Sequence, residues 1–190
     1  MLVALDIVDL ARRASAGEAA AAGALLQELE PLVVRTVRLV VGSGSWAAED
    51  AAQEALFDID RGIRSLLDPY AVKAWALRVA TQRAIKVSRR ERLLALRRSP
   101  NIDPELASGF GDPETGRAAA IKAAFDLLPP RLRATAVLRL YAGLSEEETA
   151  EALGCSVGTV KSNLHDARKR LTRALRERGF EPQTMPKEMI

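Results

Sequence analysis

The stretch LSEEETAEALGCSVGTVKSNLHDARKRL, residues 144–171, decides the fold of the C-terminal half of this chain. Ser145 followed by Glu148 forms a capping box, which predicts the start of a short helix. Gly154 then permits a tight turn, and Ser156 can cap a second helix. Two short helices joined by such a turn predict a helix-turn-helix, a unit that binds DNA.

The second helix has two chemically different faces. Its apolar residues recur at spacings of three and four, so they share one side that must pack inward: Val157, Val160, Leu164, Ala167 and Leu171. The opposite side carries Gly158, Lys161, Ser162, His165 and Lys169. This side is small or polar near the N-terminal end and cationic further on, as a helix entering the major groove requires.

Charge is sorted between these two helices. Residues 144–151 contain four acids and no base, whereas residues 157–178 contain seven bases and two acids. A basic helix can also be a solvated surface, a membrane-surface element or a calmodulin target, but the capped helix and glycine turn before it favour DNA. The single histidine, His165, could contact DNA or be a solvated surface residue, and the lack of a second histidine disfavours a metal site.

The composition of the 190-residue chain bounds its class. Hydrophobic residues make up 48% and aromatic residues only 4%, with alanine, leucine and valine set among arginine and glutamate, which predicts an all-α fold. The single cysteine, Cys155, excludes an internal disulfide, is typical of a reducing cytosol, and should be a small buried or half-buried residue. No apolar run is as long as a membrane span, and the N-terminus lacks the basic region of a signal peptide. We therefore expect a cytoplasmic protein without membrane insertion.

Breaks in the helical pattern divide the chain into two small helical domains joined by a flexible linker. The linker has three prolines, three glycines and four acids but no base. The predicted divisions are an N-terminal domain over 1–98, the linker over 99–116, the helix-turn-helix domain over 117–178 and a tail over 179–190. The expected helices are 6–14, 19–41, 47–63, 70–98, a helix from 117 to the Pro129-Pro130 pair, and 131–141.

Each predicted domain has a basic surface, because residues 83–98 also contain seven bases against one acid. Two tethered basic domains on one duplex gain effective concentration and can read two separated DNA elements together. The tether would also permit a closed and an open arrangement, an equilibrium that a partner could bias.

The chain resembles an extracytoplasmic-function (ECF) sigma factor, the minimal two-domain class of bacterial RNA polymerase specificity subunits. LPPRLRATAVLRLYAGLSEEETAEALGCSVGTVKSNLHDARKRL, residues 128–171, is similar to the promoter-binding region four of that family. AEDAAQEALFDI, residues 48–59, resembles the helix that docks on the polymerase clamp. AWALRVATQRAIKVSRR, residues 74–90, resembles the helix that reads and opens the downstream promoter element.

The resemblance implies a role for individual residues. The residues that match polymerase-contacting positions of the family are Asp50, Gln53 and Glu54. From spacing alone, these three residues could equally form an ordinary solvated helix face. Contacts with the upstream promoter element fall on Lys161, Ser162 and His165, with Arg168 and Lys169 on the DNA backbone. The resemblance assigns contacts with the downstream promoter element to Gln82 and to three bases close to it in sequence, Arg78, Arg83 and Lys86. It assigns Trp75 to the core of the domain. Tyr70 is a candidate for capturing a flipped base.

The sequence departs from the family pattern in two places. Asn163 and Asp166 stand where arginines are frequent, so phosphate contacts and upstream affinity should be weaker. Asp58 and Asp60 replace apolar, basic or aromatic residues at the end of the clamp-docking helix, which bears on polymerase docking or on the regulator that competes for it.

The leading hypothesis is therefore a sigma factor that binds core RNA polymerase and promoter DNA, with an anti-sigma protein as a further partner. Two alternatives stay open: a sigma-like decoy that binds only an anti-sigma protein, and a conventional helix-turn-helix regulator. No glycine-rich phosphate loop or metal-ligand cluster is present in the sequence, so we expect no enzyme activity, no cofactor and no metal.

Overall fold

The computed structural model describes residues 6–42, 45, 47–97 and 116–180, and no β-strand occurs among them. The N-terminal helices are α1 (Ile7–Ser15), α2 (Ala19–Val41), α3 (Ala47–Gly62) and α4 (Val72–Arg97), with two short 3₁₀ turns, η1 (Ile63–Ser65) and η2 (Pro69–Ala71), before α4. The C-terminal helices are α5 (Gly116–Asp126), α6 (Pro130–Ala136), the π-helical turn η4 (Val137–Tyr141), α7 (Glu146–Leu153) and α8 (Val157–Arg176). The all-α prediction is confirmed for this part of the chain.

Most predicted helices agree with the structure to within two residues, and the differences have local causes. The helix expected over 70–98 begins at Val72, because Asp68 caps a 3₁₀ turn at Pro69–Ala71 first. The helix expected over 131–141 changes pitch, since Ala142 N–H donates to the carbonyl of Val137, five residues back. The expected linker, apart from Gly116, and most of the expected tail lie outside the described residues.

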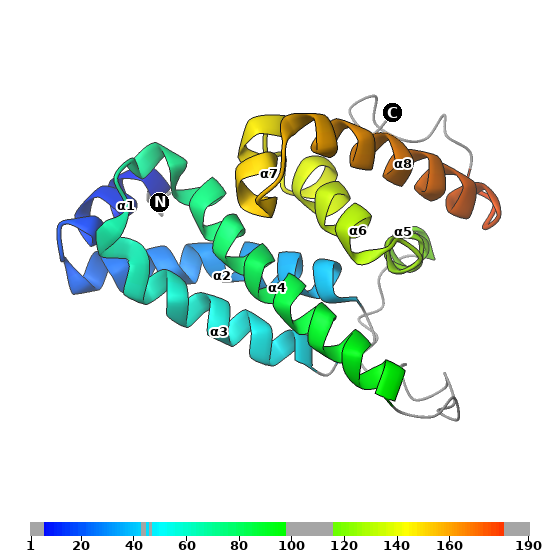
Figure 1. Cartoon of the computed structure of the whole chain (residues 1–190). Coiled ribbons are helices and arrows are strands. Elements are labelled where there is room, and N and C mark those ends of the chain that lie inside the picture. Colours follow the sequence, from blue (N-terminus) through cyan, green and yellow to red (C-terminus); the bar gives the residue numbers. More distant parts are fainter. Residues whose placement is uncertain (1–5, 43–44, 46, 98–115, 181–190) are drawn as a thin grey trace.

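Helices α2, α3 and α4 form the core of the N-terminal half, and α1 packs on α2 (Figure 1). The inward face of α2 is fully buried at Leu25, Leu29, Val33 and Val37. The inward face of α3 is mostly alanine, at Ala48, Ala51, Ala52 and Ala55. The small side chains on this face let the backbone of α3 approach α2 and α4 closely. The polar residues of α3 lie on the opposite side of the helix and face solvent.

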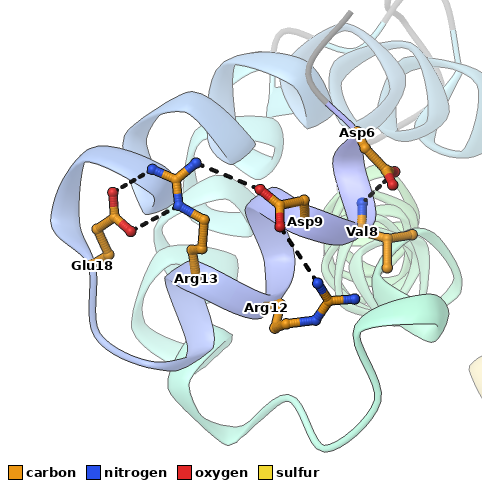
Figure 2. Close-up of polar contacts among 6 residues, drawn as sticks. All are labelled: Asp6, Val8, Asp9, Arg12, Arg13 and Glu18. Carbon is orange, nitrogen blue, oxygen red and sulfur yellow. Dashed lines mark hydrogen bonds and ion pairs between the residues drawn. The ribbon is translucent and has the colours of Figure 1, made fainter.

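The turn between α1 and α2 is held by polar contacts, which Figure 2 shows. Asp6 caps α1 by accepting from the backbone N–H of Val8 at 3.1 Å. The Nε of Arg13 donates to Glu18 at 2.8 Å, and its Nη1 lies 3.5 Å from Asp9. The hydrogen bond from Arg13 lowers the pKa of the Glu18 carboxyl. Because these side chains are more than 40% exposed, the pair orients the turn more than it stabilises the fold.

The helix-turn-helix forms as predicted. Both bonds of the capping box are present, with Ser145 N–H donating to Glu148 at 2.7 Å and Glu148 N–H donating to Ser145 at 3.0 Å. Gly154 ends α7 in the left-handed conformation, with φ of 61°, and Ser156 caps α8 by accepting from Thr159 N–H at 3.1 Å. Cys155, within the turn, is half-buried as expected.

The N-terminal and C-terminal helices pack against each other, with α4 against α7 and α2 against α6 (Figure 1). A small apolar cluster lies at this contact, with Leu77 of α4 beside Leu138, Leu144 and Ala152 of the C-terminal half. All four residues are at most 5% exposed. Of the closed and open arrangements of the two halves that the sequence permits, the structure therefore shows the closed one.

Trp75 supports the core, as expected, and its packing depends on a glycine. The half-buried indole of Trp75 lies against the end of α3, and a Cβ at Gly62 would come within 2.9 Å of its Cζ2. Gly62 has an ordinary helical backbone, with φ of −87°, so the constraint is steric rather than conformational.

We expect Gly62→Ala to lower the free energy of unfolding by about 1–3 kcal/mol, because the added methyl must displace the indole. Urea denaturation followed by circular dichroism measures this change. Gly23→Ala is the matched control, since Gly23 is also helical and a Cβ there has no heavy atom within 4 Å. Alanine should raise the free energy of unfolding by about 0.5–1 kcal/mol at that position. Equal effects of the two substitutions would contradict the steric explanation.

Candidate nucleic-acid interface

Helix α8 presents a polar face because its apolar stripe is buried. Val160, Leu164, Ala167 and Leu171 are each at most 6% exposed, and Val157 at the start of the helix is half-buried. The opposite face places Gly158, Lys161, Ser162, His165 and Lys169 at exposed positions. Main-chain geometry thus brings the predicted upstream-element residues onto one surface, and their contacts with DNA stay a prediction.

A surface pocket lies on this face between α7 and α8. It is lined by Glu146, Lys161, Leu164, His165, Arg168, Lys169 and Thr172. The Nζ of Lys161 lies 3.4 Å from the carboxylate of Glu146, in the first turn of α7. The carboxylate of Glu146 therefore holds the ammonium group of Lys161, the residue expected to read a base. The sequence analysis did not anticipate this contact.

Two other residues of α8, Arg168 and Asn163, have more specific surroundings than the sequence indicated. Arg168 is only half-exposed, and its Nε is buried with no hydrogen-bond partner among the described residues, so its stem packs against the protein. The side chain of Asn163 donates to the hydroxyl of Thr135 on α6 at 3.4 Å. Asn163 therefore connects α8 to α6, whereas Asp166 is exposed.

The four predicted downstream-element residues on α4 fall into two groups. Gln82 and Lys86 are exposed. Arg78 instead pairs with Glu151 of α7, and Arg83 pairs with Asp58 and, at 3.1 Å, with Glu54 of α3. The hydrogen bond with Asp58 is the largest cause of a raised pKa of Arg83. Both arginines would have to leave or share these carboxylates to bind a phosphate.

Helix α3 carries the three residues predicted to contact core polymerase. Asp50, Gln53 and Glu54 are exposed on the side opposite the buried alanines. Phe57 lies one turn further along and is 62% exposed. Residues three and four apart on a helix are neighbours, so Phe57 extends the surface of Gln53 and Glu54. An exposed phenylalanine beside acids suits a basic partner surface with an apolar centre, and the sequence analysis did not single it out.

Asp58 has a local structural role in this arrangement. Its side chain is 30% exposed and pairs with Arg83 across the α3–α4 contact. The sequence analysis named Asp58 as a departure from the family pattern that bears on polymerase docking. In the structure, its carboxylate faces Arg83 of α4. Asp60 is exposed.

The sequence analysis missed Glu146 and Glu151 as partners of the predicted DNA-contacting cations, and it did not anticipate that Asp58 pairs with Arg83. The acidic run at the start of α7 is visible in the sequence, but the residues that it faces depend on how the helices cross. Within the described residues, no group of histidine, cysteine, aspartate and glutamate side chains is placed to hold a metal ion. In the same part of the chain, no helix combines the length and the apolarity needed to span a bilayer.

Parts of the chain match two families of known proteins, and longer stretches are similar to individual relatives. Residues 25–93 match the family described as Sigma-70 region 2, and residues 118–171 match Sigma-70, region 4. The chain is 35% identical over 131 residues to the ECF RNA polymerase sigma factor SigE of Mycolicibacterium smegmatis, a match that covers 65% of this chain and only 50% of that relative. It is 32% identical over 174 residues to the ECF RNA polymerase sigma factor SigD of Mycobacterium bovis, covering 83% of this chain and 78% of SigD.

A solved structure shares the fold. It is the sigma factor RpoE in complex with the anti-sigma factor NepR from Bartonella quintana. Its TM-score is 0.66 at 24% sequence identity, over 79% of this chain and 95% of that chain.

The ion pair between Arg83 and Asp58 predicts energetic coupling across the α3–α4 contact. In a double-mutant cycle of Arg83→Ala and Asp58→Ala, we expect a coupling of about 1 kcal/mol, because the two charges are partly shielded from water. The free energy of unfolding of the four proteins in urea measures it. Gln82→Ala with Asp58→Ala is the control and should be additive, since Gln82 is exposed. A coupling near zero in the Arg83 cycle would show that the pair has no structural role.

Proposed function

Because the chain belongs to the family of ECF RNA polymerase sigma factors, we propose that it binds core RNA polymerase and directs transcription initiation at specific promoters. The observation that carries this proposal is the exposed face of α8, where Lys161, Ser162, His165 and Lys169 share one surface of a capped helix-turn-helix. A polar and cationic helix face of this kind can enter the major groove and contact base edges and phosphates.

The proposed roles follow the helices. Lys161, Ser162 and His165 would read the upstream promoter element, while Lys169 and the part of Arg168 that reaches solvent would hold the backbone. The exposed Gln82 and Lys86 of α4 would contact the downstream element, joined by Arg78 and Arg83 after they exchange carboxylates for phosphates. Asp50, Gln53 and Glu54 of α3 would contact core polymerase, with Phe57 beside them.

Further partners and the site of action are part of the same proposal. The structural neighbour is bound to an anti-sigma factor, and we expect an anti-sigma protein for this chain as well. The protein would act in the cytoplasm, where RNA polymerase transcribes. It would perform no covalent chemistry of its own, because positioning polymerase and stabilising opened DNA require binding energy alone.

Run-off transcription tests the function directly. Core RNA polymerase from a bacterium that encodes the relatives, mixed with this protein and a library of genomic fragments, should give transcripts that start at a small set of promoters. Core polymerase alone is the control and should give none of them. A chain that binds an anti-sigma protein but never directs initiation would be a decoy, and a chain that binds duplex tightly without polymerase would be a conventional regulator.

Lys161→Ala tests the upstream contact. We expect transcription from the cognate promoter to fall by an amount equivalent to about 1–3 kcal/mol of lost binding, and selectivity at the base it reads to relax. Lys122→Ala is the matched control, because Lys122 is an exposed lysine of the same half that lies on α5 and not on the polar face of α8. Equal activity and unchanged selectivity in both variants would remove Lys161 from the set of reading residues.

A further inference from the structure

The pocket on the polar face of α8 contains one acid among basic side chains. Its lining residues include four basic side chains, Lys161, His165, Arg168 and Lys169, and one carboxylate, that of Glu146. DNA is a polyanion, and its affinity for a protein surface rises with the number of cations that contact phosphates. A carboxylate within this pocket therefore lowers the attraction for phosphates in general.

The position of Glu146 is fixed by the start of α7. Glu146 is the first residue of that helix and directly follows the N-cap, Ser145. The reciprocal bonds between Ser145 and Glu148, of 2.7 and 3.0 Å, hold the backbone of this turn. The side chain of Glu146 is 29% exposed, whereas that of Lys161 is 63% exposed. Glu146 is thus the anchored partner of the pair, and Lys161 is the partner with more freedom.

A lysine without such a partner is poorly suited to select a base. Its ammonium is a point charge on a flexible four-carbon stem, and it lacks the planar fork with which arginine fixes its own donors. A phosphate carries a full negative charge, so it attracts an unpaired ammonium more strongly than a neutral base edge does. Contacts with phosphates carry no sequence information directly. A free lysine at position 161 would therefore add affinity rather than selectivity.

The pair with Glu146 changes this balance. The Nζ of Lys161 lies 3.4 Å from a carboxylate oxygen of Glu146, so the charge of the ammonium is already compensated. An ammonium has three N–H donors, and one directed at the carboxylate leaves two for DNA. Guanine presents two acceptors, N7 and O6, in the major groove. Guanine can thus use the two remaining donors, whereas a phosphate must compete with the carboxylate.

We propose that Glu146 is a positioning residue, which holds the ammonium of Lys161 so that it donates to a guanine of the upstream promoter element rather than to a phosphate. The proposal rests on the proposed function and deepens it, because it names the base that is read and a second residue that sets the selectivity. On other sequences, the DNA must displace the carboxylate before Lys161 can bind a phosphate. Since the pair is exposed, this displacement changes binding only a few-fold.

Base selectivity of the holoenzyme tests the proposal. Core polymerase with the full chain transcribes a library in which the upstream element of a cognate promoter is randomised, and a barcode in each transcript identifies its template. Wild type should favour guanine at one position, and Lys161→Ala should lose that preference. Glu146→Gln keeps the size of the side chain and removes its charge, so it should lower the preference for guanine at that position about two- to five-fold.

Glu147→Gln is the matched control. Glu147 is exposed in the same first turn of α7 and does not line the pocket. Both substitutions remove one acid from the N-terminal turn, so both weaken the interaction with the helix dipole to a similar extent. The control should keep the wild-type base preferences. If Glu146→Gln also keeps them, or if the control loses them equally, the proposal is wrong.

A double substitution separates positioning from direct contact with DNA. In a Lys161→Ala background, Glu146→Gln should cause no further change in base preference, because Glu146 acts through Lys161. A further change at the same position would show that Glu146 contacts the base itself, which overturns the positioning role.

Binding to duplex without a promoter supplies a second readout. The Glu146→Gln holoenzyme should bind such DNA up to about five-fold tighter than wild type, because Lys161 is free to contact a phosphate. Unchanged affinity would contradict the competition between Glu146 and phosphate. A wild-type holoenzyme that directs no promoter-specific initiation overturns the proposed function. Normal initiation with identical base preferences in wild type and Glu146→Gln overturns only the role of Glu146.

Discussion

Burial of the apolar stripe of α8 is the constraint on which the candidate interface depends. Val160, Leu164, Ala167 and Leu171 must leave water, and once they do so the rotation of α8 about its axis is fixed. That rotation alone determines that Lys161 and the polar residues beside it face solvent. The capping box at Ser145 and the left-handed Gly154 set the angle at which α8 leaves α7, so local backbone chemistry and core packing specify the same surface.

Acidic side chains cover several of the cations that the family resemblance assigns to DNA. Exposed ion pairs contribute little to stability in water, so displacing these carboxylates costs little free energy. A polyanion such as DNA presents many phosphates at once and can displace a single carboxylate, whereas an isolated anion in solution competes less well. Glu151 at Arg78 and Glu146 at Lys161 would thus raise the threshold for binding without preventing it.

The contact between the two halves differs from these surface pairs because it is desolvated. Arg133 is buried among carbonyls and carboxylates that lie far from it in sequence, and removal of one group would leave another uncompensated. Its hydrogen bonds join residues of both halves, unlike the Lys161–Glu146 pair, which lies within one half. The contact therefore exists only while α2 and α6 are packed together.

The amino-acid sequence by itself determined the helical class, the positions of most helix ends, the helix-turn-helix and the exposed face of α8. These features follow from short-range rules: capping at Ser145 and Ser156, the turn at Gly154, and a spacing of three and four for apolar residues. Only the tertiary structure decided that Asp58 holds Arg83, that Asn163 turns toward Thr135, and that Arg133 caps α2. Residues 133 and 40 are separated by 92 others along the chain, and no local pattern specifies that they meet. Such long-range pairs depend on how helices cross, and that depends on the packing of the whole core.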